Sequence, residues 1–275
     1  MTARPSGAGA VMAGRLKTPP DALDYFPTPP WAARAGGELI KRLDPEARSA
    51  WEPACGEGHM AYGLQPYFLP VWRSDVFRYE GHMLVGGHMV VDFLADDADR
   101  AWAKRNWHDG SPGPDWIITN PPFIVAEQFV RLALQRARRG VAMLVRLAFL
   151  EGVKRHRLLF VDHPLTVLAP FAERVPMVKG RWDPAASTAT AYAWFIWIKP
   201  DLALTALTLQ ASAGGHPSGP VIMPIAPGTK ARLTLPDDAR RWGRSAPAAG
   251  SSLFDIEGSE NFPFGSPHHG MVDPE

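Results

Sequence analysis

The 275-residue chain has a single cysteine, Cys55, which excludes an internal disulfide and a metal site built from several thiolates. It contains no apolar run of about 18 residues, the length that a membrane-spanning helix needs, and its first residues lack the pattern of a secretory signal. The formal net charge of +1 excludes a basic surface over the whole chain. These absences predict a soluble, cytoplasmic protein with no metal and no membrane partner.

Changes in composition divide the chain into four segments. Residues 1–20 are rich in Gly, Ala and Pro without a period, and they are predicted to form a flexible leader. Residues 21–210 carry strand and helix patterns and are predicted to form the main domain. Residues 211–244, with strand-like islands at 220–225 and 231–235, are predicted to be a short β-containing extension. Residues 245–275 are predicted to be a disordered tail.

Strand-like runs alternate with helical patterns through the main segment. The predicted strands are 50–52, 71–75, 89–94, 115–119, 141–147, 165–168 and 192–198, and the clearest helices are 31–43 and 124–139. This alternation predicts an α/β fold with a mostly parallel, seven-stranded sheet flanked by helices on both faces. In such a sheet, the loops after the carboxyl ends of the strands line a crevice that binds ligands.

One such loop contains two glycines. Glu52 ends the first predicted strand, and Gly56 and Gly58 allow the backbone to turn tightly and approach a ligand before the next helix begins. Asp75 lies 17 residues past Gly58, a spacing at which a second strand places a carboxylate on ribose hydroxyls. Asp92 lies near the end of the third predicted strand, as Asp75 does in the second. Taken alone, these acids are also compatible with solvated strand ends.

The sequence Asn120-Pro121-Pro122-Phe123 follows the fourth predicted strand. An amide oxygen and a backbone carbonyl, on Asn120 and Pro121, can accept the two hydrogens of a planar amino group and favour a tetrahedral nitrogen. The two prolines remove competing N–H donors, and Phe123 offers a face on which a planar base can stack. An ordinary strand-to-turn junction is the alternative, and the glycine loop upstream argues against it.

These two motifs, with Tyr25-Phe26-Pro27-Thr28-Pro29-Pro30 before them, resemble the amino-group methyltransferases that use S-adenosylmethionine. The most similar group is the small phage and prophage adenine-N6 DNA methyltransferases, some of which accompany restriction enzymes. The resemblance implies a Rossmann-like class I methyltransferase fold, S-adenosyl-L-methionine as cofactor, and adenine in DNA as substrate, flipped out of the duplex. Enzymes that methylate adenine in RNA or a protein glutamine amide share this chemistry and stay open as alternatives, as does a non-catalytic nucleic-acid-binding protein.

The resemblance also assigns roles to residues of this chain. It implies that the catalytic residues are Asn120, Pro121, Pro122 and Phe123. The cofactor-binding residues that it implies, together with the glycine-loop pattern, are Tyr25, Thr28, Pro29, Glu52, Pro53, Ala54, Cys55, Gly56, Gly58, His59, Met60, Asp75, Val76, Asp92, Phe93 and Asn120. Among them, Glu52 is expected to bind the methionine ammonium, Asp75 the ribose, and Asp92 the adenine amino group.

Contacts with DNA are predicted from local charge. Eight Lys or Arg residues against one acid lie between residues 131 and 157. The predicted DNA contacts are Lys154, Arg155 and Arg157 after the fifth strand, and Arg174, Lys179, Arg181 and Trp182 in the loop 173–190, with Trp182 as an aromatic wedge. A solvated loop with Trp182 packed onto the sheet is equally compatible. Near the end, Leu253 and Phe254 faintly resemble peptides that dock on a sliding clamp, although an incidental hydrophobic pair explains them more simply.

Overall fold

The computed structural model describes residues 24–79, 89–96, 113–202 and 219–243. All of these belong to the first of two units into which the chain divides, residues 1–245. The predicted leader and tail, and with them Leu253 and Phe254, lie outside the described residues. None of the helices in the described ranges has the length and apolarity that crossing a membrane requires.

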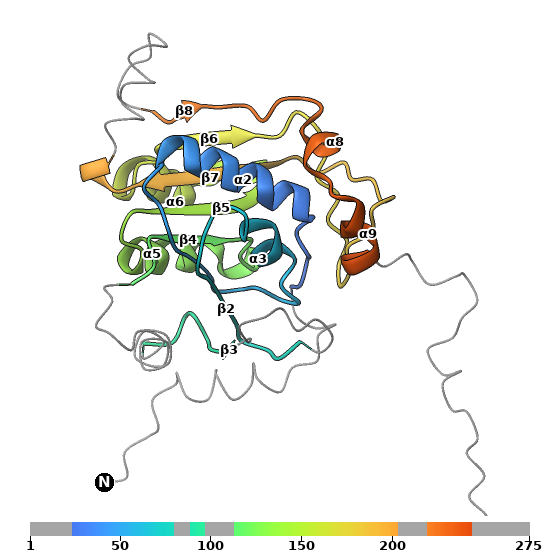
Figure 1. Ribbon diagram of the computed structural model, residues 1–275. Coiled ribbons are helices and arrows are strands. Elements are labelled where there is room, and N and C mark those ends of the chain that lie inside the picture. Colours follow the sequence, from blue (N-terminus) through green and yellow to red (C-terminus); the bar gives the residue numbers. More distant parts are fainter. Residues whose placement is uncertain (1–23, 80–88, 97–112, 203–218, 244–275) are drawn as a thin grey trace, which may run out of the picture. The chain divides into compact units, whose positions relative to one another are not determined.

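The centre of the fold is one mixed sheet (Figure 1). Its strands are β1 (Ala50–Glu52), β2 (Val71–Asp75), β3 (Met89–Val90), β4 (Trp116–Thr119), β5 (Gly140–Arg146), β6 (Val167–Pro170), β7 (Tyr192–Ile198) and β8 (Val221–Ile222). They lie in the order β3-β2-β1-β4-β5-β7-β6-β8. All neighbours pair in parallel except β7, which is antiparallel to both β5 and β6. The predicted α/β fold is confirmed, with eight strands in the described residues instead of seven.

Two hydrophobic layers cover the two faces of this sheet. In β7, Trp194 and Ile196 belong to one layer, while Phe195 and Trp197 belong to the other. Because side chains alternate across a strand and both faces are covered, the strand reads as a continuous apolar run, Tyr-Ala-Trp-Phe-Ile-Trp-Ile. Its seven-residue ladder with β5 is the longest strand pairing in the described residues.

The helices divide between the two layers. They are α2 (Pro30–Leu43), α3 (His59–Leu64), α5 (Ala126–Arg136), α6 (Val153–Arg157), α8 (Thr229–Leu233) and α9 (Pro236–Trp242), with short helical turns η2 (Phe123–Val125), η3 (Leu147–Leu150), η4 (Leu158–Asp162) and η5 (Pro200–Leu202). Helices α2 and α3 cover one face of the sheet and α5 covers the other (Figure 1). Buried side chains of α2 and α3 pack in one layer, and those of α5 and η4 pack in the other. Pro30 stands at the first position of α2, where its missing N–H costs no helical hydrogen bond.

Several predicted boundaries differ from the structure. The predicted helix 124–139 starts as η2 and ends at Arg136, because the backbone N–H groups of Arg138 and Arg139 already bond to the carbonyls before β4. The predicted strand 89–94 ends at Val90. The strand-like island at 231–235 was wrong. Residues 231–233 belong to α8, which follows Gly228 at φ +84°, buries Leu233 and ends before Thr234.

The carboxyl-terminal helices pack against the amino-terminal half of the fold. Arg34 of α2 and Asp238 of α9 form a buried bidentate ion pair, with N–O distances of 2.6 and 2.8 Å. Trp242, at the end of α9, packs on His59 and Tyr62 of α3, with ring centroids 4.5 and 5.5 Å apart. The extension therefore supports the helix that follows the glycine loop.

Candidate active site

The glycine loop turns as the sequence predicts. Gly56 and Gly58 have φ values of +52° and +98°, in the region that favours glycine. A Cβ added to Gly56 would lie 2.3 Å from Cε2 of Tyr25, so the loop backbone and this ring are in direct contact. The Cys55 N–H donates to the Ser74 carbonyl at 3.0 Å, which ties the loop to β2. The loop is thus packed against the amino-terminal element and the second strand.

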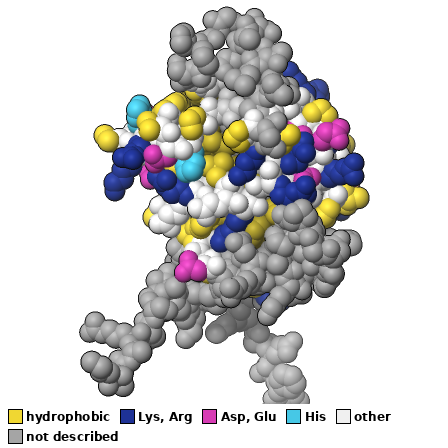
Figure 2. Space-filling view, turned by 90° about the vertical axis from the view of Figure 1, so that its left-hand side faces the viewer, with side chains coloured by type: hydrophobic (Ala, Val, Ile, Leu, Met, Phe, Trp, Pro, Cys, Tyr) yellow, Lys and Arg dark blue, Asp and Glu magenta, His cyan; other side chains and the backbone are white. Residues whose placement is uncertain are grey.

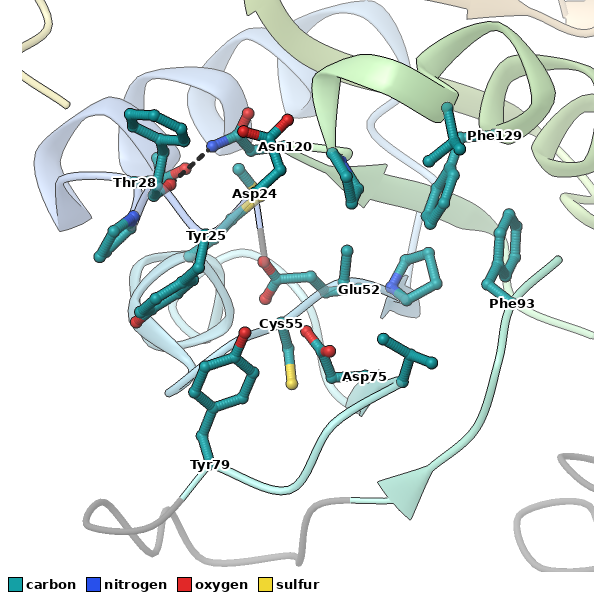
Figure 3. Close-up of a pocket in the computed structure, with 18 of the residues that line it drawn as sticks. Asp24, Tyr25, Thr28, Glu52, Cys55, Asp75, Tyr79, Phe93, Asn120 and Phe129 are labelled. Atoms are coloured by element: carbon teal, nitrogen blue, oxygen red, sulfur yellow. Dashed lines mark hydrogen bonds between the residues drawn. The ribbon is translucent and has the colours of Figure 1, made fainter. Parts of the chain in front are cut away.

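A cavity of about 260 Å³ opens beside this loop, at the carboxyl ends of β1, β2 and β4 (Figure 3). Thirteen of the sixteen predicted cofactor residues line it: Tyr25, Thr28, Glu52, Pro53, Ala54, Cys55, His59, Met60, Asp75, Val76, Asp92, Phe93 and Asn120. Pro29, Gly56 and Gly58 support the wall without lining it. Residues from three motifs that are far apart in the sequence therefore meet in one cavity.

Glu52 is a buried carboxylate that faces this cavity. Its side chain is 2% exposed, and its Oε2 has no hydrogen-bond partner in the described residues. Burial raises the pKa of Glu52 well above its usual range and the nearby Asp75 charge raises it further, whereas the Ala61 N–H and the charge of Arg73 oppose the rise. A buried acid with a free oxygen is stabilised by a cation or a hydrogen-bond donor, so the site is suited to a ligand ammonium.

Asp75 ends β2 on the same cavity. Its two carboxylate oxygens accept hydrogen bonds from the Gly56 N–H at 2.8 Å and the Phe77 N–H at 3.1 Å. Burial raises the pKa of Asp75 to about 6, although these backbone donors oppose the rise. A carboxylate has about four acceptor sites, so with three backbone donors, from Gly56, Phe77 and Val76, this one can still accept a hydroxyl donor from a ligand.

Asn120 has a defined orientation at the edge of the cavity. Its Nδ2 donates to the Phe26 carbonyl at 2.9 Å (Figure 3). The same nitrogen lies 3.6 Å from the Met177 sulfur. Its Oδ1 is buried and has no partner in the described residues. The anchored amide therefore presents a free acceptor, as an amino-group substrate would require. Asp24 holds the same loop from the other side, because its Oδ2 accepts the Phe123 N–H at 2.7 Å.

Phe123 and Pro121 do not line this cavity. The Phe123 ring packs beside Phe26, with centroids 5.2 Å apart, and the guanidinium carbon of Arg146 lies 4.0 Å from its centroid. Phe123 thus lies next to the cavity wall formed by Asn120 and Pro122, on a surface that an exposed arginine already contacts.

The predicted DNA contacts are spread over different surroundings. Lys154, Arg174 and Lys179 are exposed. Arg155 lies 3.7 Å from Glu127, Arg157 lies 3.1 Å from Asp162, and Arg181 lies 4.0 Å from Asp183. Trp182 is 3% exposed and therefore packs into the protein, so its side chain is not available as a wedge in this structure.

The basic residues between 131 and 157 also divide over two ends of the sheet. Figure 2 shows Lys and Arg side chains, mixed with acids, on the side where α2 ends and β4 and β5 begin. There, Arg139 pairs with Asp44 at 2.5 Å and Arg138 lies 3.3 Å from Asp115. These arginines are neutralised within the protein. The predicted excess of charge is therefore not one continuous surface.

Sequence reasoning missed several residues of the site. Asp24 stands directly before the predicted Tyr25, but nothing in the sequence showed that it would hold the Phe123 backbone. Tyr79 lines the cavity and packs on Tyr25 at 4.7 Å without any sequence signal. Phe129 lines the cavity from α5. Within the described ranges, no three His, Cys, Asp or Glu side chains are grouped so that they could hold a metal ion.

Comparison with known proteins gives similarities of fold. No protein-family model matches the chain, and no curated protein matches it. Among solved structures, a type I restriction-modification methyltransferase subunit from Streptococcus thermophilus is 11% identical over 64% of this chain and 45% of its own, with a TM-score of 0.43. The modification subunit of a putative type I restriction enzyme from Vibrio vulnificus is 14% identical over 78% and 51%, with a TM-score of 0.43. A putative class I S-adenosylmethionine-dependent methyltransferase from Listeria monocytogenes is 10% identical over 82% and 76%, with a TM-score of 0.44. The chain spans about half the length of the first two.

Proposed function

We propose that this protein is an S-adenosyl-L-methionine-dependent methyltransferase that modifies the N6 amino group of adenine in DNA. One observation carries the proposal. The cavity holds two buried oxygens without partners in the described residues, Oε2 of Glu52 and Oδ1 of Asn120. The first is suited to an ammonium group and the second to an amino hydrogen, so a methyl donor and an amino acceptor can meet between them.

The residues around the cavity fit this cofactor. Glu52 would bind the methionine ammonium, and Asp75 the ribose hydroxyls. Phe93 packs on Trp51 and Phe129 at 5.2 and 4.8 Å and offers an apolar wall to the adenine ring. Asp92 lines the same cavity and is 6% exposed, and its carboxylate would accept a hydrogen bond from the adenine amino group of the cofactor.

The acceptor chemistry rests on the Asn-Pro-Pro-Phe loop. When bound, the cofactor supplies an electrophilic methyl group on its sulfonium. Oδ1 of Asn120 would accept one hydrogen of the target amino group and the carbonyl of Pro121, which lies beside the cavity without lining it, the other, and this would direct the nitrogen lone pair toward that methyl. Held by Glu52 and Asp75, the cofactor would supply this methyl group, and the nitrogen would pass its proton to water once it carries the methyl. No strong base is needed, so alignment supplies most of the rate.

Mapping the modified product tests the substrate. The protein is expressed in a host that lacks adenine methylation, and modified bases are mapped in its DNA. Methyl-adenine at a defined sequence supports the proposal. If purified protein instead methylates RNA adenine or a glutamine amide in a peptide and leaves DNA unmodified, the chemistry stands and the DNA assignment fails. Cofactor binding by calorimetry without transfer to any of these would identify a non-catalytic binding protein.

Cofactor binding is expected to release a proton from Glu52. In the free protein burial raises the pKa of Glu52, whereas an ammonium partner favours its ionised form. Calorimetry at pH 7 in two buffers of different ionisation enthalpy should show a net release of protons when the cofactor binds, because binding lowers the raised pKa of Glu52. Glu52→Gln should abolish the release and weaken binding by about 10- to 100-fold, the value of a charge-assisted hydrogen bond.

The pH dependence follows from the same groups. The bound form requires ionised carboxylates, and the pKa of Asp75 is raised to about 6 in the free protein. Cofactor affinity should therefore fall as pH decreases below about 6, by up to about tenfold per unit for each proton that must be displaced. Asp75→Ala should weaken the cofactor at pH 7. Affinity that does not change between pH 5 and 7 would contradict the assignment of both acids.

A further inference from the structure

Arg146 occupies an unusual position beside the Asn-Pro-Pro-Phe loop. It is the last residue of β5, the parallel neighbour of β4, and Thr119 pairs with Met143 in that ladder. The carboxyl end of β5 therefore lies next to the loop that begins at Asn120. On its other side Arg146 pairs with Tyr192 of β7. The topology thus places this side chain at the edge of the proposed acceptor site.

Two contacts orient the Arg146 side chain. Its guanidinium lies 4.0 Å from the centroid of Phe123, the shortest cation–π contact in the described residues. It also hydrogen-bonds with Tyr192, which lowers the pKa of that hydroxyl against the larger, opposite effect of burial. Both contacts are with neutral groups, so the arginine is positioned while its charge stays available.

In the described residues no carboxylate lies within ion-pair distance of Arg146, although the charge of Asp24 acts on its partner Tyr192. Within the described residues Arg34, Arg139, Arg155, Arg157 and Arg232 each lie within ion-pair distance of a carboxylate, whereas Arg146 is exposed and forms no ion pair. An exposed guanidinium that is held in place and has no internal counter-ion is suited to an external anion, and phosphate oxygens match its planar donors.

We infer that Arg146 binds a backbone phosphate beside the extruded nucleotide and, in the free protein, covers the face of Phe123 on which the base stacks. This inference rests on the proposed function. A base that enters the site brings its own phosphodiester to the edge of the pocket. The base then takes the aromatic face from the guanidinium, and the guanidinium exchanges a cation–π contact for a charge-assisted bidentate one. Arg146 thereby couples base entry to backbone contact.

The salt dependence of DNA binding tests this role. The probe is a short duplex of the mapped sequence with 2-aminopurine in place of the target adenine, titrated in the presence of S-adenosylhomocysteine. Arg146→Ala should weaken binding about tenfold or more and reduce the slope of log K against log salt by about one, the value for one lost phosphate contact. Arg146→Lys should keep most of the slope, because it keeps the charge, and lose part of the affinity, because it loses the bidentate geometry.

The control is Arg42→Ala, which removes an exposed arginine from the last turn of α2, on the side where β4 and β5 begin, whereas Arg146 ends β5. It should change neither the slope nor the affinity by more than about twofold. Cofactor affinity should be unchanged in every variant, since Arg146 does not line the cofactor cavity. An unaltered salt slope in Arg146→Ala overturns the inference, and so does a loss of cofactor binding, which would indicate a structural role. If the wild-type protein methylates no DNA, the proposed function fails together with the inference.

Discussion

Replacement of Asn120 by alanine is expected to lower kcat by about 10²- to 10³-fold, as removal of one preorganised hydrogen-bonding group from a reacting centre does in other enzymes. Cofactor affinity should stay within about threefold. The reason is the orientation of the amide. Its nitrogen is fixed on the Phe26 carbonyl and its oxygen has no partner in the described residues, so in the proposed mechanism the group acts on the acceptor and not on the methyl donor. Single-turnover kinetics and calorimetry measure the two quantities separately.

Two further variants separate orientation from mere presence of an oxygen. Asn120→Asp keeps an oxygen at the same place but replaces the donor that binds the Phe26 carbonyl, so it should also lose turnover. Met177→Leu removes the sulfur that lies 3.6 Å from the amide nitrogen while it keeps a similar volume, and it should change kcat by less than about threefold. Full turnover in Asn120→Ala would place the catalytic group elsewhere and remove the basis of the proposed function.

The parts of this site that could be predicted are those encoded in short stretches of sequence. Strands β1, β2 and β7 have their predicted bounds. Pro53 directly follows β1 and Pro200 comes two residues after β7, and a proline cannot donate a hydrogen bond to the sheet. Glu52 and Asp75 line one cavity because each ends a parallel strand. Ligands bind outside the carboxyl ends of such strands, so the strand pattern alone predicts that the two acids share a site.

What could not be predicted depends on contacts between distant segments. Asp24 and Phe123 are 99 residues apart, and their hydrogen bond exists only because the amino-terminal element folds over the end of β4. The helix α8 was missed because Ala-Arg-Leu-Thr-Leu alternates like a strand, and burial of Leu233 against the layer that contains α2 decides its conformation. The sequence left open whether Trp182 is an aromatic wedge or packs onto the sheet, and in the structure its side chain is buried.

Disruption of the Arg34–Asp238 ion pair is expected to cost about 3–5 kcal/mol of stability, the range for removal of one partner from a buried pair. The side chains are 4% and 0% exposed, so either group, left alone, would be an uncompensated buried charge. Arg34 also donates to the Leu233 carbonyl at 2.8 Å, and Asp238 accepts the Leu235 N–H at 2.9 Å. Urea unfolding of Arg34→Ala and Asp238→Ala, followed by tryptophan fluorescence, measures the effect.

A matched pair on the same two elements provides the control. Arg232 and Glu38 also form two hydrogen bonds, at 2.6 and 2.7 Å, between the extension and α2, but they are 56% and 35% exposed. Because solvent screens the charges and the long side chains lose entropy, Arg232→Ala should cost at most about 1 kcal/mol. Equal losses in the two pairs would mean that burial does not set the strength of the connection.

The double variant Arg34→Leu/Asp238→Leu distinguishes two causes of the lost stability: loss of the attraction between the two side chains, and burial of one charge without its partner. If the cost of each single variant comes mainly from the charge left behind, the double variant should be more stable than either, because it leaves no buried charge. Its effect on the site should also be smaller. Trp242 of α9 packs on His59, which lines the cofactor cavity, so undocking of α9 in the single variants should weaken cofactor binding along with stability. A single variant that loses stability but keeps full cofactor affinity would show that α9 stabilises the fold without positioning the glycine loop.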